Sequence, residues 1–241
     1  MLAGGHTILS IGDSMSEEYA FELTFSSPES DPTQANTRNW LEILNRRRGK
    51  GSGDDWFFFG SHQSALLSYT DLRNAGFASN FGVPTFTTGD WIEVRHTTSP
   101  SFSDYFQTLR YNTRVEIGSQ LPDVSAVVIF LGGNDLKNDY TEIFNDTLPD
   151  SFYTGIVDRI FELRTWLAAL DPDVKTVVCT VPDVGVAPSV SQTYNDPALR
   201  AAARARIAAM NADLASRAAA IANVEVADIH ALTLHIEDET P

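Results

Sequence analysis

Five short apolar runs constrain the fold of this chain more than any other feature of its sequence. They lie at about residues 6–12, 55–60, 125–131, 175–181 and 224–229. Most are continuous rather than alternating in polarity, which is typical of parallel strands covered on both faces. Helical patterns separate them, with the clearest at residues 39–44, 152–170 and 197–222. The alternation predicts an α/β fold, a three-layer α/β/α sandwich around a mostly parallel five-stranded sheet.

Residues 80–120 interrupt this rhythm. The stretch is rich in Thr, Ser, Phe and Tyr, and within it Trp91-Ile92-Glu93-Val94 predicts a strand. We expect an insertion over one end of the sheet, which serves either as a lid or substrate wall or as plain loop decoration. Since no repeat, low-complexity tract or linker is visible, the sequence predicts one domain over residues 1–241.

Composition limits the partners. The chain carries 32 acidic and 17 basic residues, a formal net charge of -15. Such a field repels phosphate backbones, so we expect no nucleic-acid partner. No apolar stretch approaches the ~20 residues of a membrane span, and residues 1–5 show no signal-peptide pattern. The compartment stays open, with a secreted or periplasmic location favoured over a cytoplasmic one, and the oligomeric state is not readable. The single cysteine, Cys179, lies in an apolar run and predicts a buried thiol.

Two polar clusters follow two of the apolar runs and carry the chemistry. Gly12-Asp13-Ser14 ends the first run, and Leu131-Gly132-Gly133-Asn134-Asp135 ends the third. Open α/β sheets place their chemistry at the carboxyl ends of strands, so the two clusters can meet at one edge. Ser14 is a candidate nucleophile, whose own N–H points to an oxyanion if a helix begins at Ser16. Asn134 supplies a side-chain donor, and the turn-like residues 74–79 are a candidate third donor.

These residues resemble the GDSL or SGNH hydrolase family, whose fold is flavodoxin-like. The resemblance rests on Gly12-Asp13-Ser14-Met15-Ser16, on the turn 74–79 and on Gly132-Gly133-Asn134-Asp135, and their order matches over most of the chain. It implies that Ser14 is the nucleophile and that Asn134 and a glycine N–H complete the oxyanion hole. In the family this glycine lies five residues after the asparagine of the turn, and this chain has Ser79 at that position. The resemblance therefore makes the backbone N–H of Ser79 a candidate oxyanion donor, and Gly76 in the same turn is another candidate.

The chain departs from the family in its catalytic base. The family takes the base from an Asp-x-x-His motif, and no such motif occurs in this sequence. The surroundings of His235 look like those of the family histidine, with Leu232 in place of the aspartate. Three explanations stay open: the chain ends before the catalytic loop, His235 works without its aspartate, or the base lies elsewhere. For His230 a structural role is favoured, and a strand would place Glu93 and His96 on opposite faces.

The sequence therefore predicts a serine hydrolase that cleaves carboxylic esters through an acyl-enzyme on Ser14. An esterase, a lipase and a carbohydrate O-deacetylase all fit, so the substrate is a small-molecule, glycan or lipid ester. The alternative is a non-catalytic ligand- or carbohydrate-binding domain of the same fold that lacks the base. We expect no cofactor, and no metal because His6 and His62 lack clustered ligands. An α/β-hydrolase elbow does not fit, since Ser16 stands where G-x-S-x-G requires glycine.

Overall fold

A mostly parallel sheet forms the centre of the molecule in the computed structural model, which describes residues 5–17, 39–49, 56–63, 68–73 and 75–238. Its strand order is β2-β1-β6-β7-β8, and every neighbouring pair is parallel. The strands are β1 (Gly5–Gly12), β2 (Trp56–Phe58), β6 (Ala126–Phe130), β7 (Lys175–Cys179) and β8 (Val224–Ala227). All five apolar runs are therefore strands, and the predicted α/β class is confirmed.

Three short strands were not predicted. The first, β5 (Asn80–Gly82), pairs in parallel with the last residues of β1. The other two, β3 (His62–Gln63) and β4 (Gly76–Phe77), form a separate antiparallel ribbon. Each of the three contains at most one large apolar residue, so no apolar run marks it in the sequence.

The helices lie on both faces of the sheet. They are α1 (Trp40–Arg48), α2 (Thr88–His96), α3 (Tyr105–Gln120), α4 (Gly133–Asn138), α5 (Tyr140–Phe144), α6 (Asp150–Leu170), α7 (Pro188–Thr193), α8 (Pro197–Ala219) and α9 (Ile229–Asp238), with 3-10 turns η2 (Leu121–Asp123) and η3 (Val184–Val186). The three helices predicted from the sequence correspond to α1, α6 and α8. Pro197 stands in the first turn of α8, where its missing N–H costs no hydrogen bond.

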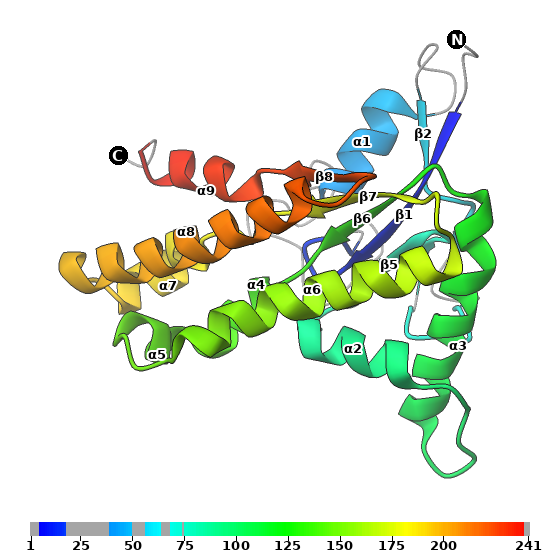
Figure 1. Cartoon of the computed structure of the whole chain (residues 1–241), viewed down its shortest axis with the longest axis horizontal. Helices are drawn as coiled ribbons and strands as arrows, with labels where there is room; N and C mark the ends of the chain where they lie inside the picture. Colours follow the sequence, from blue (N-terminus) through cyan, green and yellow to red (C-terminus); the bar gives the residue numbers. More distant parts are fainter. Residues whose placement is uncertain (1–4, 18–38, 50–55, 64–67, 74, 239–241) are drawn as a thin grey trace.

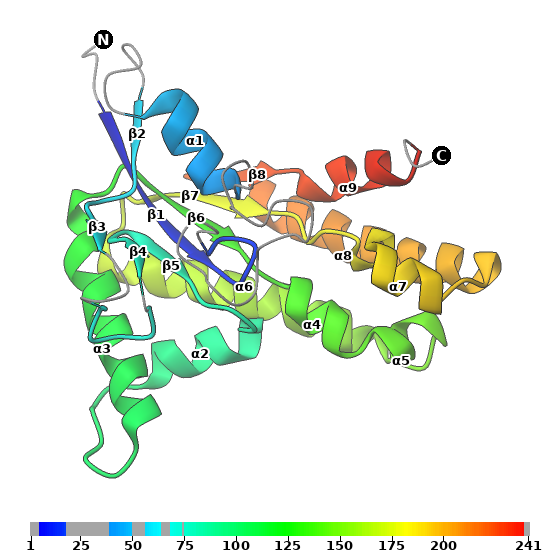
Figure 2. The same ribbon diagram turned by 180° about the vertical axis from the view of Figure 1, so that it is seen from behind.

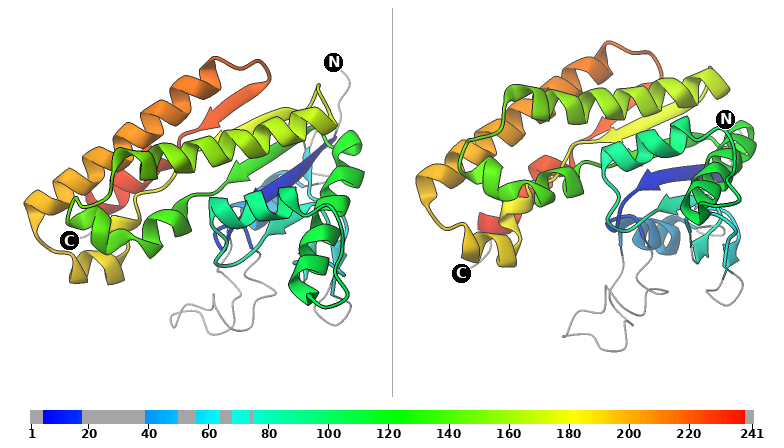
Figure 3. Two further views of the ribbon diagram at one scale, coloured as in Figure 1. Left: turned by 60° about the horizontal axis from the view of Figure 1, so that its bottom comes forward. Right: turned by 90° about the horizontal axis from the view of Figure 1, so that it is seen from below.

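Two cores hold the layers together. Helices α6 and α8 lie together on one face of the sheet, and α1 lies on the other (Figures 1 and 3). The larger core joins inward side chains of β1 and β6, such as Leu9 and Ile129, to those helices. The smaller core packs Leu41 of α1 against Ile8 and Phe59. The view from behind shows α1 beside β2 and the C-terminal ends of the strands directed toward α4 (Figure 2).

The strand predicted at Trp91–Val94 is wrong, because these residues belong to α2. Thr87 and Asp90 form a capping box: the Thr87 hydroxyl accepts from the Asp90 N–H, and the Asp90 carboxylate accepts from the Thr87 N–H. Trp91 and Val94, three residues apart, are both fully buried on one helix face. The capping box and the helical spacing of Trp91 and Val94 outweigh the preference of β-branched residues for strands. The prediction that residues 80–120 are an insertion is a separate matter and stays a prediction.

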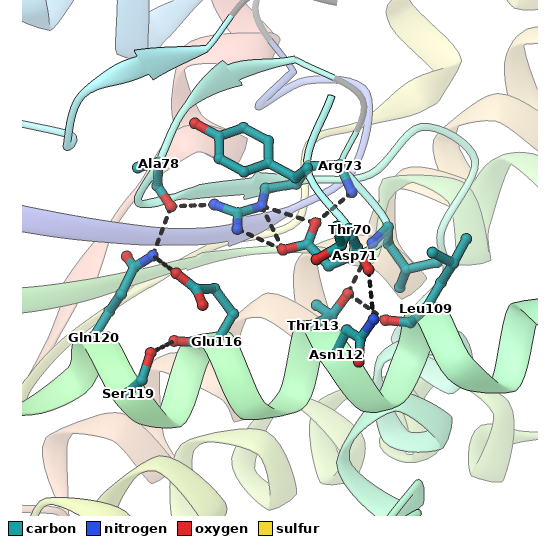
Figure 4. Close-up of polar contacts among 12 residues, drawn as sticks. Thr70, Asp71, Arg73, Ala78, Leu109, Asn112, Thr113, Glu116, Ser119 and Gln120 are labelled. Carbon is teal, nitrogen blue, oxygen red and sulfur yellow. Dashed lines mark hydrogen bonds and ion pairs between the residues drawn. The ribbon is translucent and has the colours of Figure 1, made fainter. Parts of the chain in front are cut away.

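A buried ion pair and separate hydrogen bonds to α3 hold the chain before β5 in place (Figure 4). The Arg73 guanidinium binds both carboxylate oxygens of Asp71, with Nη2 at 2.5 Å from Oδ2, and it also donates to the carbonyl of Ala78. It stacks between the rings of Tyr69 and Phe81, at 4.0 and 3.9 Å from their centroids. Since Phe81 belongs to β5, this arrangement holds β5 in its place beside β1.

We expect Asp71→Ala to lower the free energy of unfolding by about 3–5 kcal/mol, because the buried guanidinium of Arg73 loses its carboxylate. Chemical denaturation measures the change. A matched control is Glu93→Ala, which breaks the more exposed pair between Glu93 and Arg110 and should cost less than about 1 kcal/mol. Equal losses for the two variants would contradict this account of the buried pair.

Candidate functional site

Ser14 lies at the apex of a tight turn just beyond β1. The Ser16 N–H donates to the Asp13 carbonyl at 3.0 Å, and the Met15 N–H donates to the Asp13 carboxylate at 2.9 Å. These two bonds satisfy the backbone around Ser14 while its own N–H and hydroxyl have no hydrogen-bond partner among the described residues. Of the helix predicted to begin at Ser16, most residues lie outside the described part of the chain, and Ser14–Ser16 form a turn.

The turn is anchored from several sides. The Gly12 carbonyl accepts from the indole N–H of Trp91 at 3.1 Å and from the N–H of Val83 at 3.1 Å. The Ser16 carbonyl accepts from the side-chain amide of Asn80 at 2.7 Å. A side chain at position 12 would have no room, because its Cβ would lie 2.4 Å from the Ser16 hydroxyl oxygen. The glycine before the aspartate is therefore required by close packing.

Asn134 comes to the same edge of the sheet from β6. Gly12 and Phe130 are paired residues at the ends of β1 and β6. The chain then turns at Gly132, whose φ of 104° suits glycine, and α4 begins. A Cβ built on Gly133 would lie 2.8 Å from the Met15 methyl carbon and 3.6 Å from the Asp13 Oδ2. The start of α4, which carries Asn134, thus packs directly against the Ser14 turn.

The loop after β5 joins these two segments, and the sequence analysis missed it. Val83 donates to Gly12, as described above, and the Asn134 side-chain amide donates to the Phe86 carbonyl at 3.0 Å. Between them lies Thr85, an exposed residue with φ of 67°, whose N–H has no partner among the described residues. A β-branched residue rarely adopts this conformation, and such strain is concentrated at functional sites. Thr85 follows Asn80 by five residues, so the spacing applied to residues 74–79 fits here too.

The buried carboxylate of Asp135 fixes the loop after β5 relative to the start of α4. Asp135 accepts from the Thr88 N–H at 2.9 Å and from its hydroxyl at 2.6 Å. Arg159 of α6 donates to the Thr88 hydroxyl at 2.6 Å and to Asp135 at 3.3 Å. The start of α2 is therefore bound to the start of α4. We call these contacts among Thr88, Asp135 and Arg159 the clamp. Phe86 lies two residues before Thr88, and Asn134 directly precedes Asp135. The clamp therefore fixes the positions of Phe86 and Asn134 relative to each other.

Ser79 and Gly76 lie away from Ser14. The Ser79 N–H, the candidate oxyanion donor, already donates to the Phe59 carbonyl at 2.8 Å, and the Ser79 carbonyl accepts from Ser10. Gly76 lies in β4, where its carbonyl accepts from the Tyr69 hydroxyl. Asn74, from which the five-residue spacing was counted, lies outside the described residues. The structure thus brings Ser14 and Asn134 together and leaves Ser79 and Gly76 elsewhere.

No histidine contacts Ser14 within the described residues. His235 is exposed near the end of α9. His230 is buried in the first turn of α9, and its N–H donates to the Thr180 hydroxyl at 2.8 Å. That turn follows β8, which lies three strands from β1, or about 14 Å. The Nε2 of His230 is buried and has no described partner.

Glu93 and His96 also need correction. The expectation of opposite faces rested on a strand, and in α2 two residues three apart share a face. They nevertheless do not pair with each other. Glu93 pairs with Arg110, and His96 lies 3.4 Å from Glu162.

Burial sets the ionisation of two groups. Burial, with a smaller contribution from the neighbouring Asp135, raises the pKa of Asp13 to about 6 against the lowering effect of the Met15 N–H. The Asp13 Oδ2 is buried with no partner among the described residues. The predicted buried thiol is confirmed, since Cys179 is buried and its pKa is raised to about 12. Such a thiol is a poor nucleophile at neutral pH.

No group of three or more His, Cys, Asp and Glu side chains in the described part of the chain could hold a metal ion. No helix there combines the length and apolar character that a membrane crossing needs.

The sequence is similar to known proteins over most of its length. A family model described as GDSL-like Lipase/Acylhydrolase matches residues 8–240. Among solved structures, the Clostridium thermocellum family 3 carbohydrate esterase is similar with 15% sequence identity and a TM-score of 0.43, covering 95% of this chain and 80% of that one. No curated protein matches the sequence.

We expect the buried carboxyl of Asp13 to make stability pH-dependent. Its pKa is about 6 in the folded chain against an ordinary value of 3.8, so the folded state holds the proton more tightly. The free energy of unfolding should therefore fall as the pH rises from about 4 to 6, by an amount on the order of 2–3 kcal/mol. Asp13→Asn removes this contribution and keeps an oxygen for the Met15 N–H. Denaturation of both proteins at pH 4 and pH 7 measures it, and equal pH dependence in parent and variant would contradict it.

Proposed function

The chain belongs to the GDSL-like lipase/acylhydrolase family, and on that premise we propose that it hydrolyses carboxylic esters through an acyl-enzyme on Ser14. The observation that carries the proposal is the meeting of three segments at one sheet edge: the Ser14 turn, the loop 83–86 and the start of α4. They present a hydroxyl and hydrogen-bond donors next to one another. Acyl transfer requires this combination.

In the proposed reaction the Ser14 oxygen attacks the ester carbonyl carbon, and its proton passes to a base. The carbonyl oxygen becomes an oxyanion, which accepts from the N–H groups of Ser14 and Thr85 and from the Asn134 amide. Asn134 donates one amide hydrogen to Phe86, so its other hydrogen is available for this bond. Collapse of the intermediate breaks the ester C–O bond and releases the alcohol, which takes the proton from the base. Water then attacks the acyl-enzyme and frees the acid.

In this proposal Thr85 takes the place that the family resemblance gave to Ser79. A backbone N–H donates regardless of its side chain, so threonine serves provided that the loop holds it at positive φ. The bonds from Val83 to Gly12 and from Asn134 to Phe86, on either side of Thr85, hold the loop in that conformation. Asp13 braces the turn in this proposal and does not react.

The proposed mechanism needs a base that accepts the proton of the Ser14 hydroxyl. His235 remains the candidate that the sequence offers, and its exposed position on α9 gives it no described contact with Ser14. The substrate is proposed at the level of carboxylic esters, whether small-molecule, glycan or lipid. Substitution of His235 by alanine tests the base directly, since an unchanged rate of hydrolysis excludes it.

One observation favours a second candidate function. Because no described histidine contacts Ser14, the same edge of the sheet fits a domain that binds acyl or acetylated carbohydrate groups without turnover. Such a domain would bind esters and release no alcohol from them. An active parent protein rules out this second candidate.

We expect Ser14→Ala to abolish hydrolysis of p-nitrophenyl acetate and butyrate, because no acyl-enzyme can form. Asn134→Ala should lower kcat about 10²- to 10³-fold, the usual cost of one oxyanion donor, with a smaller effect on KM. Release of p-nitrophenol measures both. Asn138→Ala is the matched control, since Asn138 is exposed at the end of the same helix and should retain full activity. Hydrolysis that survives Ser14→Ala would refute the proposed function.

A further inference from the structure

The connection between α2 and α3 ends in an exposed aromatic cluster, which we call the aromatic tip (residues 97–106). The fractional exposure of Phe102 is 113%, that of Tyr105 is 72% and that of Phe106 is 64%. The segment projects from the body of the molecule at the bottom of Figure 1. Exposed apolar residues are ordinary one at a time, but three large rings gathered on a projecting segment indicate a binding surface.

The aromatic tip is held in shape by its own hydrogen bonds. Ser101 and Thr108 bond twice, from the Ser101 N–H to the Thr108 hydroxyl at 3.1 Å and from that hydroxyl to the Ser101 carbonyl at 2.7 Å. The Gln107 side chain donates to the Ser99 carbonyl at 3.2 Å, and Asp104 caps α3 by accepting from the Gln107 N–H. The rings of Tyr105 and Phe106 meet edge to face at 6.3 Å. A surface fixed in this way loses little entropy when it binds.

We propose that the aromatic tip binds an uncharged polysaccharide. The C–H groups of a sugar ring pack on the face of an aromatic ring, which carries partial negative charge. The residues before and after the rings in the segment 97–109 are mostly Ser and Thr, with Gln107, and their hydroxyl and amide groups suit the hydroxyl groups of a sugar. Phe102 and Tyr105 are the stacking residues, because they are the most exposed of the three rings.

Charge favours this ligand over a lipid surface. The segment 97–109 contains no lysine or arginine, and the whole chain has a net charge of -15, so anionic membranes are repelled. Insertion into a neutral bilayer would bury the carboxylate of Asp104, which lies between Phe102 and Tyr105 in sequence and is exposed. Transfer of a charge and several hydroxyl groups out of water opposes insertion, whereas a hydrated polysaccharide leaves them solvated.

The aromatic tip lies away from the Ser14 edge. Thr88, at the start of α2, belongs to the clamp beside Ser14, and the tip follows the other end of this 9-residue helix, about 13 Å along its axis. Binding at the tip therefore needs neither the nucleophile nor a base. The inference does not rest on the proposed function.

Retention on insoluble cellulose and on insoluble mannan tests the inference, with sedimentation of bound protein as the readout. We expect the parent chain to bind one of them, and Phe102→Ala combined with Tyr105→Ala to weaken that binding at least about tenfold. Phe102→Trp should keep binding because it keeps a ring. Leu170→Ala, at an exposed apolar site on α6, and Ser14→Ala should also bind as the parent does. Equal melting temperatures confirm that the variants fold.

Three results would overturn the inference. The first is no retention of the parent on either polysaccharide. The second is retention that the double variant keeps unchanged. The third is parent binding to phosphatidylcholine vesicles that the double variant loses while polysaccharide binding is unaffected, which would assign the tip to a lipid surface.

Discussion

The buried carboxylate of Asp135 is the interaction on which the candidate site depends. It binds the N–H and hydroxyl of Thr88 and is joined by Arg159 of α6, so three elements meet at one charged group. Asn134 directly precedes Asp135, and Phe86 lies two residues before Thr88. The side-chain amide of Asn134 donates a hydrogen bond to the Phe86 carbonyl. A buried charge without partners would be costly, and here each of its oxygens is satisfied. The strained Thr85 persists because the segments on both sides of it are fixed.

The two acidic side chains at this edge have different environments. Asp135 has a cation and two donors from Thr88, whereas Asp13 uses one oxygen for the Met15 N–H and buries the other without a described partner. The pKa of Asp13 is accordingly raised to about 6 by burial. An ionised carboxylate opposes an oxyanion nearby, and with a pKa of about 6 the Asp13 carboxyl is neutral only below that pH.

The sequence was sufficient to predict the frame of the molecule. Continuous apolar runs marked the five strands in the order β2-β1-β6-β7-β8, and the clusters after β1 and β6 were expected to meet because parallel strands end at one edge. The sequence was not sufficient to predict that Thr85 lies in the loop beside the Ser14 turn. Ser79 and Thr85 both lie five residues after an asparagine, and only the pairing of β5 with β1 shows that the second loop reaches Ser14. The error at Trp91 has a local cause, since a capping box outweighed residues that favour strands. The exposure of the aromatic tip could not be predicted from the sequence, because it depends on which other segments of the folded chain pack against these rings.

A crystal structure of the chain soaked with phenylboronic acid tests the central claim most directly. Boron takes up the serine oxygen and becomes tetrahedral, so its own oxygen occupies the position of the oxyanion. The account predicts a bond from boron to the Ser14 oxygen, with a boronate oxygen within hydrogen-bond distance of the Ser14 N–H, the Thr85 N–H and the Asn134 amide. Boron on another residue, or a boronate oxygen that contacts neither Thr85 nor Asn134, would contradict it.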